Sequence, residues 1–79
     1  MSAQLGEIRR ENGLAGQVSY TVMVTYPGEK ASAVQFVGSC YGGPVTMVTE
    51  RGGQTFVDDP ARFGEFGPEW VRRFFASGD

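Results

Sequence analysis

Alternation of apolar and polar side chains in the first half of the chain predicts a β-strand with one buried face. Between residues 17 and 26 the apolar positions are Val18, Tyr20, Val22, Val24 and Tyr26. The positions between them are Ser19, Thr21, Met23 and Thr25. A period of two is the pattern of a strand whose alternate side chains face a core. We therefore expect the second set on the outer face of a sheet.

Turn signals divide the middle of the chain into further strands. Pro27-Gly28-Glu29-Lys30 predicts a turn, because proline presets φ at its first central position and glycine accepts a positive φ at the next. Strands are then expected over about 31–37, 45–50 and 54–57, separated by a loop over 38–43 and a turn at Arg51-Gly52-Gly53. Consecutive strands joined by short glycine-bearing turns form an antiparallel meander.

The C-terminal region predicts a helical cover for this sheet. Asp59-Pro60 starts a single helical turn that Gly64 ends, and Gly67-Pro68 starts an amphipathic helix that Gly78 closes. The apolar side of that helix carries Trp70, Val71, Phe74 and Phe75. Together with Phe63 and Phe66, these aromatic residues are expected to cover the apolar face of the sheet.

Residues 4–12 allow either a strand or a short helix. Asn12-Gly13 is a hairpin signal, but a plain two-residue turn there pairs Glu7 with Val18 and so places a charge on the apolar face. A bulge at Gly16 shifts the register by one and brings Ile8 inward. We favour this bulged strand.

The helical alternative for the same residues begins at a Ser2 cap and ends at Gly13. With either interpretation the fold class is α+β: one domain over residues 1–79, with an antiparallel meander of four to five strands and the C-terminal helix packed on one face. The sequence leaves open whether the sheet curls towards a small barrel.

Composition excludes several classes of function. The chain has 79 residues, one cysteine and no histidine, so no disulfide closes within it, and histidine catalysis and most zinc sites are excluded. No apolar run is long enough for a membrane helix and the first residues lack the pattern of a secretory signal, so a cytoplasmic location is expected.

No motif predicts a catalytic, cofactor or metal site. Gly38-Ser39-Cys40-Tyr41 matches part of a papain-type nucleophile sequence, but that chemistry needs a histidine base. Asp58-Asp59, Glu65 and Glu69 do not have the spacing of a calcium loop. We expect no enzymatic activity, no cofactor, no metal and no small-molecule substrate.

The charge balance disfavours nucleic acid as a partner. Arginines near aromatic residues can stack on bases, but nine acidic residues outnumber seven basic ones and the formal net charge is −2. Nucleic-acid binding by a small β-domain is kept as an alternative, as is a minor structural role in a phage particle.

The uncharged middle of the chain is its most informative feature. Between Asn12 and Thr49 only Glu29 and Lys30 are charged, so the outer face of the sheet is expected to be neutral throughout. Sheets usually guard their edges with charges, and an unguarded sheet suits a docking partner or a second copy. Serine and threonine are also ordinary residues of a solvated sheet face. The candidate interface residues are Ser19, Thr21, Met23, Thr25, Arg72 and Arg73.

The long strand, the Gly-Gly turns, the segment 56–64 and the sequence Glu69-Trp70-Val71-Arg72-Arg73-Phe74-Phe75 together resemble the small orphan proteins carried by phages of actinobacteria. The likeness is one of size and style over the whole chain. The resemblance implies a protein that acts by binding a host or viral protein and that can be toxic to the host. It transfers no functional residue. From the neutral sheet we predict a noncatalytic protein-interaction module that self-associates or binds a host protein, in the host cytoplasm, through its sheet face or edge.

Overall fold

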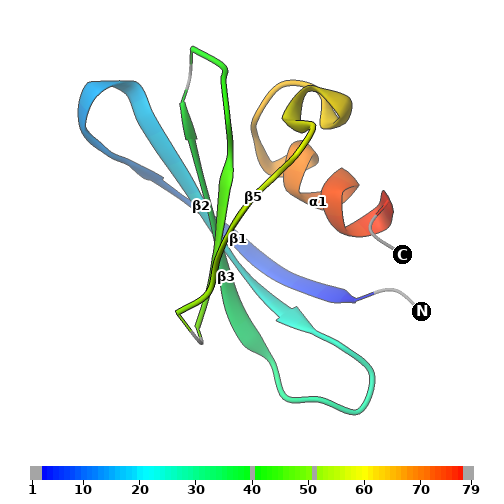
Figure 1. Cartoon of the computed structure of the whole chain (residues 1–79). Coiled ribbons are helices and arrows are strands. Elements are labelled where there is room, and N and C mark those ends of the chain that lie inside the picture. The colour runs from blue at the N-terminus through cyan, green and yellow to red at the C-terminus, as the bar shows by residue number, and fades with distance from the viewer. Residues whose placement is uncertain (1–2, 40, 51, 78–79) are drawn as a thin grey trace.

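The computed structural model describes residues 3–39, 41–50 and 52–77. They form a five-stranded antiparallel sheet in which the strands lie in chain order, with one helix packed on one face (Figure 1). The predicted α+β meander is confirmed. The strands are β1 (Gln4–Asn12), β2 (Gln17–Thr25), β3 (Ser32–Ser39), β4 (Thr46–Thr49) and β5 (Gln54–Phe56). The helical elements are the short 3-10 turns η1 (Leu14–Gly16) and η2 (Pro60–Phe63) and the helix α1 (Pro68–Ser77).

The sheet is open, so the barrel that the sequence allowed does not form. Among the described residues β1 pairs only with β2 and β5 only with β4, which leaves these two strands as the edges. The layer made by α1 and η2 covers the inner face, and β5 has only three residues to offer a closing partner. Burial is therefore achieved by the helical layer instead of by closure.

The inner face of β2 forms the centre of the core, as its alternation predicts. Val18, Tyr20, Val22 and Val24 are all buried. Tyr26 was expected to join them, but it lies beyond the end of β2 and is 44% exposed. Its carbonyl oxygen accepts the Glu29 N–H at 3.0 Å, so Tyr26 already belongs to the turn.

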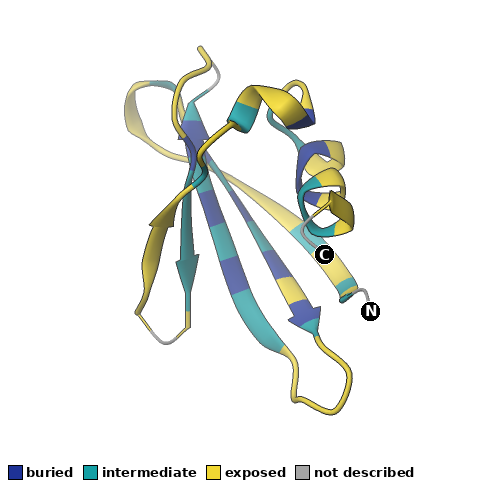
Figure 2. Ribbon diagram, turned by 45° about the vertical axis from the view of Figure 1, so that its right-hand side comes forward, coloured by how far each residue is buried: buried dark blue, intermediate teal, exposed yellow. Residues whose placement is uncertain are grey.

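The expected aromatic cover is confirmed. Phe36 in β3 is fully buried, and its ring centroid lies 5.4 Å from that of Trp70, 5.1 Å from that of Phe74 and 5.7 Å from that of Phe75. The indole N–H of Trp70 donates to the Pro60 carbonyl oxygen at 2.9 Å, which ties α1 to η2. In Figure 2 buried positions alternate with less buried ones along β2 and β3, and further buried positions lie in α1 beside the sheet.

The N-terminal segment is the strand β1, so the helical alternative is wrong. Ile8 pairs with Val22 and therefore shares its inward face, as expected. The bulge lies between Leu5 and Ile8, where two residues of β1 oppose one of β2, and not at Gly16.

The connection between β1 and β2 also differs from the two-residue hairpin. It spans residues 13–16 through η1, with Ala15 at φ 56° and Gly16 at φ 80°. The Gly13 N–H donates to the Gln17 carbonyl oxygen at 2.7 Å and closes this loop. The longer loop changes the register, which places Asn12 opposite Val18.

Strand β3 is longer than predicted, because Gly38 continues it instead of opening a loop. A Cβ atom at Gly38 would lie 2.9 Å from the Phe66 ring, so the absent side chain leaves space for that ring. Strands β4 and β5 lie within their predicted ranges and are shorter. The expected helix end at Gly78 and the expected loop position of Cys40 lie outside the described residues.

Candidate functional site

The four predicted interface residues of β2 share the outer face of the sheet. Met23 is 43% exposed, and Ser19, Thr21 and Thr25 are partly buried between neighbouring strands. No helix covers this face among the described residues, because α1 packs on the opposite one (Figure 2). The outer face of β2 is thus open to contact.

This outer face is not neutral throughout, which corrects the sequence-based expectation. Arg9 pairs with Thr21 and Glu11 pairs with Ser19, so two charged side chains of β1 lie directly beside the predicted surface. Arg9 and Glu11 precede the uncharged stretch in the sequence. They reach this face because β1 pairs along the length of β2. Across β3, β4 and β5 the outer face is uncharged, with Val37, Thr46 and Phe56 in one cross-strand row.

Arg72 and Arg73 do not join the β2 residues in one surface. Both lie on α1, which covers the inner face of the sheet, so the two predicted groups lie on opposite layers of the molecule. Arg72 forms an ion pair with Glu69 of the same helix, and a guanidinium N–H of Arg73 donates to the Phe63 carbonyl oxygen at 3.3 Å. Each arginine is therefore already engaged within the helical layer.

The hydrogen bonds between β4 and β5 show which residues of β5 direct their backbone groups at β4. The Val57 N–H donates to the Val45 carbonyl oxygen at 2.9 Å, and the Thr49 N–H donates to the Gly53 carbonyl oxygen at 3.0 Å. Hydrogen-bonded and non-hydrogen-bonded pairs alternate along an antiparallel ladder. The odd-numbered residues from 53 to 57 therefore direct their backbone groups at β4.

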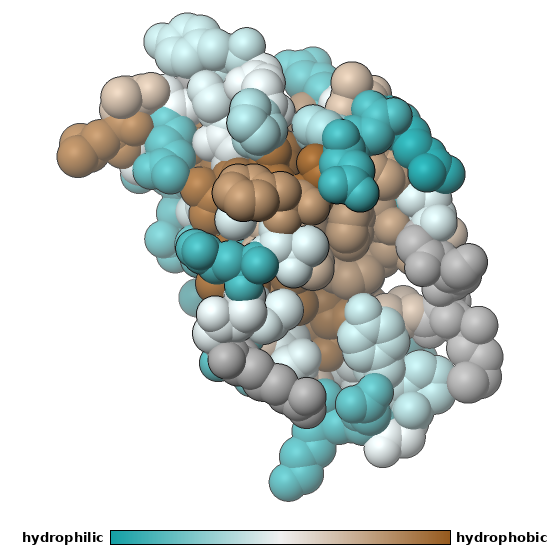
Figure 3. Space-filling model, viewed as in Figure 1, coloured by the Kyte–Doolittle hydropathy of each residue, from teal (hydrophilic) through white to brown (hydrophobic). Residues whose placement is uncertain are grey.

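The even-numbered residues of β5 direct their backbone groups at the free edge. Gln54 and Phe56 each present one N–H and one C=O away from β4, and both residues are exposed. Phe56 is 71% exposed. Figure 3 shows hydrophobic surface in the middle of the molecule, in the region where Figure 1 places β5 and α1.

Sequence reasoning predicted binding at the sheet face or an edge but did not single out this edge, although two signals for it were present. Residues 52–57 carry no charge, and the last strand of an open meander is an edge. The opposite edge is different: β1 carries the charged residues Glu7, Arg9, Arg10 and Glu11. Charged side chains are a common device against unwanted strand pairing, so β1 is guarded and β5 is not.

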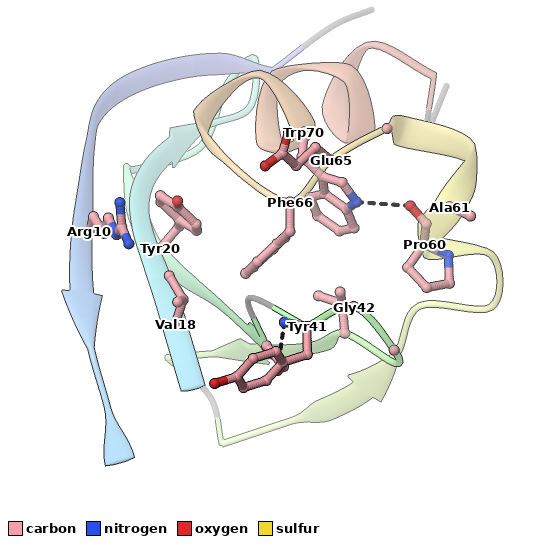
Figure 4. Close-up of a pocket in the computed structure, with 14 residues that line it drawn as sticks. Arg10, Val18, Tyr20, Tyr41, Gly42, Pro60, Ala61, Glu65, Phe66 and Trp70 are labelled. Carbon is pink, nitrogen blue, oxygen red and sulfur yellow. Dashed lines mark hydrogen bonds between the residues drawn. The ribbon is translucent and has the colours of Figure 1, made fainter. Parts of the chain in front are cut away.

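An open cleft of about 620 Å³ lies between the sheet and the helical layer, at the end of the sheet where β2 begins (Figure 4). Tyr20 and Phe66 form its inner wall, with ring centroids 5.0 Å apart at an angle of 83°. Tyr41, 85% exposed, stands at its mouth. Arg10 and Glu65 are the charged residues among the described ones that line the cleft. No nucleophile paired with a base lines it among the described residues.

Metal and membrane sites have no support in the described part of the chain. No three Asp, Glu or Cys side chains lie close enough together within residues 3–39, 41–50 and 52–77 to hold a metal ion. Among the same residues, no helix has the length and hydropathy that crossing a bilayer requires.

Comparisons with known proteins identify no relative of this chain. No protein-family model matches it, and no curated protein or solved structure gives a significant match.

Proposed function

We propose that this chain is a noncatalytic protein-interaction module that binds an extended segment of its partner along the free edge of β5. The observation that carries the proposal is the set of backbone groups that Gln54 and Phe56 direct away from β4. An added strand gains main-chain hydrogen bonds from such groups, and neighbouring side chains supply selectivity.

The surroundings of β5 support the same proposal. A smaller cavity of about 270 Å³ lies between β5 and the helical layer, and its lining includes the apolar side chains of Met47, Phe63 and Phe74. Alternate residues of a strand face opposite sides of a sheet. A bound segment can therefore place one side chain towards this cavity while the next contacts Phe56 on the outer face.

We also propose that this interaction takes place in the cytoplasm. A chain with a single cysteine needs no oxidising compartment to complete its fold. The resemblance to phage proteins favours a host protein or a second copy as the partner.

The test uses a displayed library of random peptides as the probe. Gln54→Pro removes an outward N–H without removing a β4 hydrogen bond, because the Gln54 N–H faces the free edge. Leu14→Lys is the matched control, since Leu14 is 89% exposed in η1, in the connection between β1 and β2. We expect peptides selected on the unaltered chain to bind the Leu14 variant equally and to lose binding to the Gln54 variant. Failure of the monomeric chain to enrich any peptide, or equal binding of the selected peptides to all three proteins, would contradict the proposal.

A further inference from the structure

We propose that a second copy of this chain occupies the free edge of β5, so that two sheets join into one across a two-fold axis at Thr55. This inference rests on the proposed function, because it names the partner of the same edge. Three features of the described residues favour a second copy: the hydrogen-bond register, the position of Phe56 and the distribution of charge.

The hydrogen-bond register of β5 is self-complementary. In antiparallel pairing about Thr55, Gln54 of one copy lies opposite Phe56 of the other, and the reverse pair follows by symmetry. Both residues direct an N–H and a C=O outward, so every outward donor meets an outward acceptor. Shifting the register so that Gln54 meets Gln54 places Phe56 opposite Gly52, whose N–H already donates to the Thr49 carbonyl oxygen. Shifting it so that Phe56 meets Phe56 places Gln54 opposite the acidic Asp58, beyond the end of β5.

The same register brings the two exposed phenylalanines together. Side chains of Gln54 and Phe56 share the outer face of the sheet, so the Phe56 residues of the two copies become diagonal neighbours across the new seam. Diagonal neighbours in an antiparallel pair lie within reach of aromatic side chains. Pairing therefore covers the most exposed phenylalanine of the described chain, which is otherwise 71% exposed.

The distribution of charged residues favours antiparallel over parallel pairing of the two β5 strands, and it limits the assembly to two copies. The acidic residues Asp58 and Asp59 follow β5, and parallel pairing would place each beside its own copy. In the antiparallel register Asp58 lies opposite Gly52, which has no side chain and has open space around its Cα atom. The other edge, β1, carries four charged residues, so the assembly closes at two copies.

Sedimentation velocity over a range of concentrations tests the assembly. A contact along three residues lies at the small end of protein interfaces, so we expect a monomer–dimer equilibrium that favours the dimer towards about 1 mM. Phe56→Lys and Gln54→Pro should each weaken dimerisation by roughly tenfold or more, while Leu14→Lys leaves it unchanged. Circular dichroism confirms folding, and Phe56→Lys decides the outcome if Gln54→Pro is unfolded.

Cross-linking tests the register. In a Cys40→Ser background, Thr55→Cys places two thiols opposite each other across the axis, within the span of a disulfide. Gln54→Cys is the matched control, because its position faces Phe56 of the other copy. We expect rapid oxidation to a covalent dimer for the Thr55 variant and slow oxidation for the Gln54 variant; equal rates would contradict the register.

The outcomes separate this inference from the proposed function. A chain that stays monomeric up to about 1 mM but binds displayed peptides at β5 refutes self-association and keeps the interaction module. A monomer that binds no peptide refutes both. Oligomers larger than two, or a dimer that both β5 variants leave intact, refute the assembly.

Discussion

Replacing Phe36 with alanine tests whether the aromatic cover holds the domain together. The Phe36 ring is fully buried at the centre of the sheet and makes edge contacts with the rings of Trp70, Phe74 and Phe75. Truncating a buried phenylalanine costs about 3–5 kcal/mol, through lost transfer free energy and the cavity left behind. A chain of 79 residues has a free energy of unfolding of about 4–12 kcal/mol, so the variant loses a quarter of its stability or more.

Phe56→Ala is the matched control for Phe36→Ala, because Phe56 is 71% exposed on the outer face. Its free energy of unfolding should change by about 0.5 kcal/mol or less in dilute solution, where we expect a monomer. Urea unfolding followed by Trp70 fluorescence and circular dichroism measures both variants. If Phe36→Ala cost less than about 1 kcal/mol, or no more than Phe56→Ala, the helical layer would not be the cover that the contacts indicate.

Three further substitutions test individual contacts, each by urea unfolding. Gly38→Val should lower the free energy of unfolding by about 1–3 kcal/mol, because its Cβ would lie 2.9 Å from the Phe66 ring; an unchanged midpoint would contradict this packing. Trp70→Phe removes the donor to the Pro60 carbonyl oxygen and should cost at least about 1 kcal/mol, so full stability would exclude that hydrogen bond. Arg72→Ala removes an exposed ion pair and should change stability by less than about 1 kcal/mol at any salt concentration.

The alternation of β2 and the glycine turns were sufficient to predict the meander. Each strand needed only a local pattern, and each short turn forced the next strand to be its neighbour. The aromatic cover was predictable for the same reason, since helical spacing places Trp70 and Phe74 on one side of α1.

Register and strand length were not predictable, because they depend on distant contacts. The bulge in β1 lies between Leu5 and Ile8, where both flanking side chains face the core, and no local signal marks it more strongly than Gly16. Gly38 looked like a loop residue, and only the position of the Phe66 ring explains why it continues β3.

The candidate interface was predicted in part. Alternation placed Ser19, Thr21, Met23 and Thr25 on one face, but it carried no information about which residues of other strands would lie beside them. The register between β1 and β2 places Arg9 and Glu11 on this face. The register between β4 and β5 decided that Gln54 and Phe56 direct their backbone groups at the free edge, which depends on whether odd or even residues bond to β4.

Amide hydrogen exchange at Gln54 and Phe56 tests the central claim most directly. In dilute solution both N–H groups face solvent and should exchange nearly as fast as those of an unstructured peptide. As the protein concentration rises, the paired edge should slow exchange at these two residues, while Thr55, already bonded to β4, changes little. Fast exchange at Gln54 and Phe56 at every concentration would contradict the pairing of two copies through β5.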